Sequence, residues 1–122
     1  MVEWNGTVVS INRKFLPKIE VNENRKEYRL RLSPKYIDFM DSISNFCRKK
    51  IKKHNGYVDL FLVVYFKRNF DTDNFLKPFC DALKKALVIE DDKFIRNIYV
   101  KRYYSEYGKD DIIKFELKEV QN

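Results

Sequence analysis

The sequence predicts an α+β fold: a single domain, residues 1–122, with a mixed β-sheet, two main helices packed on it and a C-terminal β-hairpin. Three observations lead to this prediction. The 122 residues suffice for one hydrophobic core and not for two. Two segments repeat apolar residues at the three- to four-residue spacing of a helix. Shorter segments are rich in the β-branched and aromatic residues that are typical of strands.

The first strand is expected at residues 7–11, TVVSI, which are short and β-branched. Residues 12–28 are polar and basic and contain Pro17, so we interpret them as a loop with room for a small hairpin. Residues 27–33, EYRLRLS, are either a short strand or the lead into the next helix. The N-terminal strand of the sheet should therefore come from residues 7–11.

The first helix is predicted to begin at Ser33 and Pro34, an N-cap residue followed by a proline in the first turn. Its buried face consists of apolar residues three or four positions apart: Tyr36, Met40, Ile43, Cys47 and Ile51. Asn55-Gly56 is expected to end it. The basic residues within 48–53 fit a solvated helix end that complements the dipole, and contact with phosphate is the alternative.

Residues 58–66, VDLFLVVYF, are apolar at both odd and even positions, which predicts a central strand covered on both faces. A second helix follows, with apolar residues at helical spacing: Phe75, Phe79, Leu83 and Ala86. Because proline lacks an amide hydrogen, Pro78 should lie in the first turn. The helix should therefore begin near Asp73 or Asn74.

The last two strands are expected at residues 94–105 and 112–120. Residues 106–111, EYGKDD, join them, with Gly108 in the turn, which is typical of a hairpin. With the strand at residues 58–66 and the N-terminal strand, this hairpin completes the predicted mixed sheet.

The net charge of the chain narrows the classes of molecule that it is expected to bind. The chain has 25 Lys plus Arg against 18 Asp plus Glu, and its net charge of +7 favours nucleic acid ahead of a membrane surface. No apolar run approaches the roughly 20 residues of a membrane span. The N-terminus lacks the apolar region of a signal peptide. We therefore expect a soluble, cytoplasmic protein without a membrane partner.

The cysteine and histidine content limits the kinds of metal site and catalytic chemistry that the chain can support. Cys47 and Cys80 each follow a helical apolar pattern and are expected to be reduced and packed. The one histidine, His54, makes a zinc site or a histidine-based nucleophile triad improbable. Any catalysis should therefore come from carboxylates.

Asp71 and Asp73 are the first candidates, because they follow the most apolar strand directly. In an extended chain, residues two apart lie on the same side at about 6.6 Å. Carboxylates that close repel each other unless a cation lies between them, and oxygen ligands suit Mg²⁺ or Mn²⁺. Asp91 and Asp92 follow the second helix and could fold back beside the first pair.

Two alternatives bear on these acids. A calcium loop of the EF-hand type that starts at Asp71 would need glycine where Leu76 stands and glutamate where Ala82 stands, so this alternative fails. The structural alternative makes the first pair helix caps and places the second pair in an ordinary turn. A cap needs one acid, however, and the chain supplies two.

Lys77 lies four residues after Asp73 on the same helical face, and Asp81 follows one turn later. This spacing predicts surface ion pairs, each worth a few tenths of a kcal/mol. The functional alternative is a cation directed at a phosphate that the metal also binds.

The run DTDNFLKPFCDAL, the later VIEDDKFI and Lys101 resemble the RusA-type Holliday-junction resolvases. The signature of that family is D-x-D-N-x-x-K, then D-A-L, then an acidic pair. The matching residues are Asp71, Asp73, Asn74, Lys77, Asp81, Ala82, Leu83, Asp91 and Asp92. SINRKF, at residues 10–15, weakly resembles the N-terminal segment of the family. Glu90 stands where the family usually has an apolar residue, and the connection before it lacks the family's glycine.

The resemblance implies a homodimeric endodeoxyribonuclease that depends on Mg²⁺, with Mn²⁺ as a substitute. It would resolve four-way DNA junctions by paired nicks, leaving 5′-phosphate and 3′-hydroxyl ends, in the recombination and repair of a bacterial or phage-infected cell. Asp71, Asp73 and Asp92 would be metal-binding catalytic acids, Lys77 the catalytic lysine, and Asp91 a supporting member of the metal site. The expected DNA-binding residues are Asn12, Arg13, Lys14, Lys18, Arg25, Lys26, Asn74 and Lys101.

Two other functions stay open at this point. One is a related metal-dependent nuclease that acts on other branched DNA or on another nucleic acid. The other is a non-catalytic nucleic-acid-binding module in which the acidic cluster is incidental.

Overall fold

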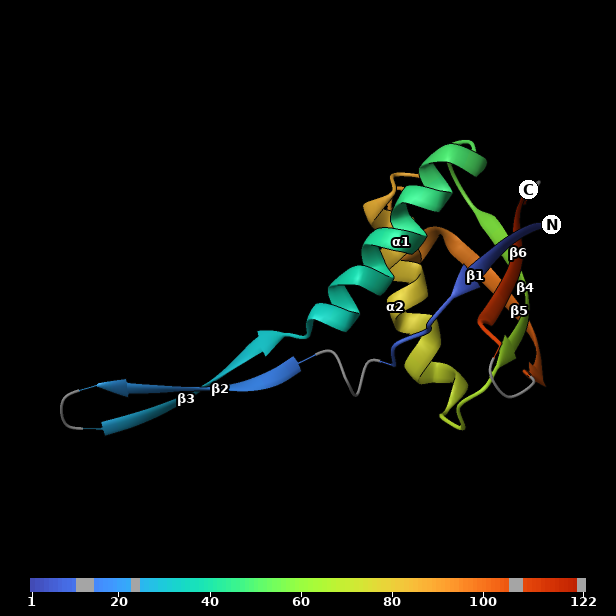
Figure 1. Ribbon diagram of the computed structural model, residues 1–122. Coiled ribbons are helices and arrows are strands. Elements are labelled where there is room, and N and C mark those ends of the chain that lie inside the picture. The colour runs from blue at the N-terminus through green and yellow to red at the C-terminus, as the bar shows by residue number, and fades with distance from the viewer. Residues whose placement is uncertain (11–14, 23–24, 106–108, 121–122) are drawn as a thin grey trace.

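The computed structural model describes residues 1–10, 15–22, 25–105 and 109–120 of the chain (Figure 1). In chain order its elements are β1 (Val2–Gly6), β2 (Phe15–Asn22), β3 (Arg25–Leu32), α1 (Pro34–Lys50), β4 (Val58–Phe66), α2 (Thr72–Lys85), the short 3₁₀ helix η2 (Asp92–Phe94), β5 (Ile95–Tyr104) and β6 (Asp111–Glu119). None of the helices in these ranges is long and apolar enough to cross a membrane.

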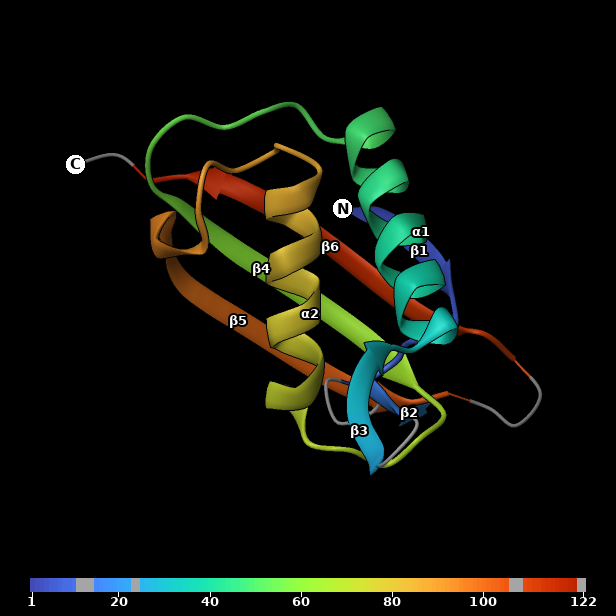
Figure 2. The same ribbon diagram turned by 90° about the vertical axis from the view of Figure 1, so that its left-hand side faces the viewer.

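The main sheet has four strands in the order β1-β6-β4-β5. β4 pairs parallel with β5 and antiparallel with β6, and β1 pairs antiparallel with β6. Both helices lie on the same face of this sheet (Figure 2). The predicted α+β class, with a mixed sheet and two helices packed on it, is therefore confirmed.

The two C-terminal strands are consecutive and antiparallel, as the hairpin prediction requires, but β4 lies between them. The two strands therefore do not pair directly with each other, which corrects that part of the hairpin prediction. Parallel pairing of β4 with β5 requires a crossover connection, and α2 supplies it. β6 then fills the other side of β4, where Ile113 and Phe115 are fully buried. Gly108, predicted for the turn, lies outside the described residues.

The N-terminal strand is β1, Val2–Gly6, and the described residues 7–10 are in no strand, so that prediction is wrong in position. Val8 and Val9 are buried without being in a strand. The reason is that the backbone N–H of Val8 donates to the Asp111 carboxylate over 2.9 Å instead of to a strand partner. The apolar pattern at Val8 and Val9 therefore indicates burial in the core, and not a strand.

β2 and β3 form a separate two-stranded sheet that projects from the body of the molecule as an arm (Figure 1). Their antiparallel register runs from Phe15 opposite Leu32 to Asn22 opposite Arg25. The predicted loop thus contains a hairpin, with strands of eight residues each. Of the two alternatives for residues 27–33, the strand is confirmed.

Both helices are present, with boundaries that differ from the predictions. α1 buries the predicted face but ends at Lys50, before Asn55-Gly56. The chain then becomes extended because His54 is buried, donating its backbone N–H to the Val88 carbonyl at 2.8 Å. α2 begins at Thr72, so Pro78 lies inside the helix and the predicted start is wrong. Proline forfeits only one helical hydrogen bond here, and its ring is buried in the core.

Aromatic rings fix α2 against the sheet. Phe75 packs edge-on against Phe66 of β4 with ring centroids 4.9 Å apart, and Phe79 packs against Phe115 of β6 at 5.0 Å. All four side chains are fully buried. These contacts set the position of the helix that carries Asp73 and Lys77.

The two cysteines are free and buried, as predicted. Burial raises the pKa of Cys47 to about 12 and, with smaller contributions from Asp92 and Asp81, that of Cys80 to about 11. Both thiols are therefore un-ionised at neutral pH, the form that packs as a small apolar group.

β4 is the central strand, but only one of its faces is covered. Alternate residues from Val58 to Phe66 are buried beneath the helices, whereas Asp59, Phe61, Val63 and Tyr65 are only half-buried. The expectation of two covered faces is therefore wrong. The aromatic residues on the second face pack against side chains of β5 and β6 instead of a helix.

Candidate active site

The first acidic pair lies where the chain passes from β4 into α2. Asp71 occupies the N-cap position with extended backbone (φ −64°, ψ 140°), and its carbonyl accepts from the Asn74 N–H at 3.0 Å. Asp73 lies in the first turn. Carboxylates at a helix N-terminus are stabilised by the partial positive charge there. The fold therefore tolerates two negative charges at this junction.

Neither carboxylate is used by the local structure. Both residues are exposed, and the Asp71 side chain makes no capping hydrogen bond. Within the described part of the chain, Asp71 and Asp73 have no ion pair. The capping alternative thus explains the position of Asp71 but not its carboxylate, which is free to bind a ligand.

Arg102 of β5 stabilises the loop that leads to Asp71. Its guanidinium donates to the Phe70 carbonyl and, at 3.0 Å, to the Arg68 carbonyl, and it lies over the Phe66 and Phe70 rings. Sequence reasoning missed this residue. The available signal was strand alternation, which puts Arg102 on the same face as Val100, a partly buried residue that packs against the core, where a charge needs a partner.

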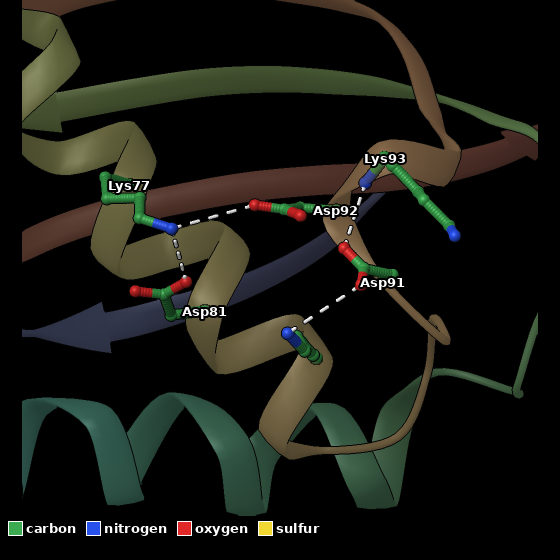
Figure 3. Close-up of polar contacts among 6 residues, drawn as sticks. Lys77, Asp81, Asp91, Asp92 and Lys93 are labelled. Carbon is green, nitrogen blue, oxygen red and sulfur yellow. Dashed lines mark hydrogen bonds and ion pairs between the residues drawn. The ribbon is translucent and has the colours of Figure 1, made fainter.

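Lys77 is the centre of the second group of charges (Figure 3). Its Nζ lies 3.1 Å from Asp81 Oδ1 and 3.7 Å from Asp92 Oδ2. The hydrogen bond and charge of Asp81, followed by those of Asp92, raise the pKa of Lys77. Lys77 is therefore a stable cation, and at 56% exposure it is accessible to an anionic ligand.

Asp91 and Asp92 face different partners although they are adjacent (Figure 3). Asp91 caps η2 by accepting from the Lys93 backbone N–H at 3.2 Å, and its other oxygen lies 3.9 Å from Lys84 Nζ. A hydrogen bond with Asp92, the Lys93 amide and the charge of Lys84 lower the pKa of Asp91. Asp91 therefore shapes the turn, while Asp92 points to Lys77.

A pocket of about 310 Å³ opens beside these charges. Its lining combines the charged side chains of Lys77, Asp92 and Lys93 with apolar surface from α2 and β5, contributed by Leu76, Cys80, Ile95 and Ile98. A pocket lined by both charged and apolar side chains can accept a group that is anionic on one side and uncharged on the other.

The described residues contain no group of three His, Cys, Asp or Glu side chains close enough to hold a metal ion together. Lys77, Asp81 and Asp92 are brought together, whereas Asp71 and Asp73 stay one or more helical turns away along α2. Mg²⁺ usually takes one or two protein carboxylates and completes its shell with waters and phosphate oxygens. The exposed acids fit such a hydrated ion, and they do not form a closed cage.

The predicted DNA-binding residues that the structure describes fall in three places: the arm, α2 and β5. Asn12, Arg13 and Lys14 lie outside the described residues. Lys18 is in β2, opposite Arg29, and Arg25 and Lys26 begin β3, so the arm carries all three. Asn74 is in the first turn of α2, and Lys101 is exposed on β5.

Comparison with known proteins gives one family. The model of the family described as Endodeoxyribonuclease RusA matches residues 17–112, a range that includes most of the arm, both acidic pairs and β5. No curated protein matches the sequence.

Proposed function

The chain belongs to the RusA endodeoxyribonuclease family, and from this premise we propose that it is a Mg²⁺-dependent nuclease that resolves four-way DNA junctions. The observation that carries the proposal is the placement of Lys77, an accessible cation held between two carboxylates at the rim of a pocket. An ion pair that contributed only to stability would require a single carboxylate partner, and it would not have to lie beside a pocket. A phosphate could displace Asp92 from Lys77, because that contact is the longer of the two.

Lys77 would bind a non-bridging oxygen of the scissile phosphate and stabilise the charge that develops there. Asp81 would keep the ammonium in place, since it makes the shorter contact, 3.1 Å. The apolar lining residues Leu76, Cys80, Ile95 and Ile98 would contact the uncharged part of the nucleotide beside that phosphate.

Asp71, Asp73 and Asp92, with Asp91 in support, would hold Mg²⁺ or Mn²⁺, which supplies an activated water and neutralises phosphate charge when bound. Asp71 and Asp73 suit this role because they are exposed and have no ion pair among the described residues. The product ends would be a 5′-phosphate and a 3′-hydroxyl.

Paired nicking requires two sites related by the two-fold symmetry of the junction, so we propose a homodimer. The basic residues of the arm and of residues 12–14 would bind the flanking backbone, consistent with the net charge of +7.

The test uses a synthetic four-way junction labelled in turn on each strand. We expect symmetric nicks in two opposed strands with Mg²⁺, and none with chelator or in Asp71→Asn and Asp92→Asn, although both variants should still bind the junction. Asp41→Asn is the matched control, because Asp41 pairs with Lys85 at 2.7 Å and lies outside the pocket lining.

An intact junction in the presence of Mg²⁺ or Mn²⁺, across several junction sequences, would overturn the proposal. Cleavage of flaps or forks but not of junctions would identify the related branched-DNA nuclease instead. Unchanged binding without cleavage of any substrate would favour the non-catalytic module.

A further inference from the structure

β5 is an open edge of the main sheet. It spans Ile95–Tyr104, pairs with β4 on one side, and has no strand on the other side among the described residues (Figure 2). Large side chains are unusually exposed along it: Ile98 at 41%, Tyr99 at 52%, Tyr103 at 41% and Tyr104 at 74%. A long edge strand with exposed aromatic residues invites a partner.

The tyrosines end two rows of side chains that cross the sheet. Tyr99 stacks on Phe61 at 4.9 Å, and Lys118 covers that ring from β6 at 5.1 Å. In the next row Tyr103 stacks on Tyr65 at 5.2 Å, and Lys114 covers Tyr65. Because β4 lies between β6 and β5, Tyr99 and Tyr103 stand at the β5 end of their rows, and Lys101 Nζ lies over the Tyr103 ring, 6.0 Å from its centroid. Tyr104 stacks on no ring of the described chain.

The charges of the strand identify the kind of partner. β5 carries Arg96, Lys101 and Arg102 and no acid. Lys93 precedes it, and exposed Lys67 lies at its far end, where the Ser105 N–H donates to the Phe66 carbonyl. A second copy of β5 would add three cations and no acid, so no ion pair could form between the two strands. A polyanion is complementary along the whole edge.

The edge is continuous with the candidate active site. Ile95 and Ile98 of β5, and Lys93 before it, line the same pocket as Lys77 and Asp92. A DNA strand whose phosphate contacts Lys77 would therefore leave the pocket along β5.

We propose that the open edge of β5 binds an unpaired segment of the DNA strand next to the scissile phosphate. Bases would stack on the exposed rings of Tyr99, Tyr103 and Tyr104, and phosphates would contact Lys93, Arg96 and Lys101. The segment must be unpaired, because aromatic rings stack on bases whose faces are free and a duplex hides them. This inference rests on the proposed nuclease function and specifies that the enzyme holds its substrate locally melted.

The test measures the fluorescence anisotropy of a labelled oligothymidine and of a duplex of equal length, both in chelator so that nothing is cleaved. Tyr104→Leu should weaken oligothymidine binding roughly fivefold or more and leave duplex binding unchanged. Tyr104→Phe should bind like the wild type, because the ring is retained. Ile37→Ala, which truncates an exposed apolar residue of α1, is the control and should change neither affinity.

Lys101→Ala adds an independent readout. It should weaken oligothymidine binding and lower the slope of log Kd against log salt by about one, whereas Tyr104→Leu should not change that slope. Equal binding of oligothymidine by wild type and Tyr104→Leu would overturn the inference. So would a shift of the Tyr104→Leu variant from dimer to monomer in sedimentation, which would make the edge an interface between copies.

Junction cleavage by the same proteins separates this inference from the proposed function. If the wild type cuts junctions but Tyr104→Leu binds oligothymidine normally, the edge site is wrong and the nuclease stands. If nothing is cut but oligothymidine binding depends on Tyr104, the edge site stands and the nuclease proposal fails.

Discussion

Lys77 is the residue that connects the acids of α2 with those of η2. Its two carboxylate contacts are of different length, 3.1 Å to Asp81 and 3.7 Å to Asp92, and they come from different elements. The sequence predicts the pair with Asp81, because the two residues are four apart on a helix. The contact with Asp92 depends on how η2 folds back toward α2. Lys77 thus contacts one carboxylate that is close to it in the sequence, Asp81, and one that is distant, Asp92.

Lys77→Ala should reduce junction cleavage by about 100-fold while junction binding is retained, because one cation at the developing charge is lost. Lys85→Ala is the matched control: Lys85 is on the same helix and pairs with Asp41 at 2.7 Å, outside the pocket. Single-turnover cleavage measures both variants. If Lys77→Ala cuts as fast as Lys85→Ala, Lys77 is only part of a surface ion pair.

Asp81→Asn should lower the pKa of Lys77, because the hydrogen bond and charge of Asp81 are the largest causes that raise it. The cation is present below this pKa and is lost as pH rises through it, so the titration of Lys77 moves to lower pH in the variant. The ¹³Cε shift of Lys77 against pH measures this, with Lys85 as internal reference. Cleavage at pH 8 should slow less than in Lys77→Ala, and an unmoved titration would contradict a positioning role.

At the scale of elements, β6 holds the active-site framework through one buried carboxylate. Asp111 is 1% exposed and accepts from the backbone N–H groups of Val8 and Lys67, each at 2.9 Å. It therefore fastens the segment after β1 and the end of β4 to the start of β6. The loop that carries Asp71 begins at this point, and Arg102 fixes it from β5.

Asp111→Ala should lower the free energy of unfolding by about 3 kcal/mol, since two buried N–H donors lose an ionic acceptor. Asp111→Asn should cost less, because one oxygen acceptor remains. Urea unfolding followed by circular dichroism measures both variants. Asp110→Ala, an exposed neighbour, is the control and should stay within about 0.5 kcal/mol of the wild type. Equal loss in the two alanine variants would contradict the role of Asp111.

At the scale of the whole molecule, the arm extends the basic surface beyond the body (Figure 1). β2 and β3 belong to a separate sheet, so their contribution to the stability of the main core is small. Three predicted DNA contacts, Lys18, Arg25 and Lys26, lie in these strands. The fold thus separates the element that would bind flanking DNA from the element that would cut.

Replacing Lys18, Arg25 and Lys26 by alanine together should weaken junction binding and lower the slope of log Kd against log salt by up to about three. The comparison is a triple alanine variant of Lys49, Lys50 and Lys53, which changes the net charge equally at the end of α1. Titrations of a labelled junction in chelator measure both. An equal loss in the two variants would indicate that charge acts non-locally, and would support phosphate contact by the end of α1.

Features that depend on neighbours along the chain could be predicted from the residues alone. Helical spacing placed α1 and α2, β-branched and aromatic runs located β4, β5 and β6, and local spacing paired Lys77 with Asp81. Predictions from the sequence misplaced the N-terminal strand and the start of α2. At these two places the burial of Val8 and the packing of Pro78 outweighed the local secondary-structure preference of the residues.

Features that depend on strand order and on contacts between distant elements became visible in the fold. β4 separates β5 from β6, which leaves β5 as the open edge with its exposed tyrosines. The fold brings Asp92 to Lys77 and places Arg102 under the loop before Asp71. These residues are far apart in the chain. They come together because α2 packs on the sheet, and the spacing of residues in the sequence does not indicate that packing directly.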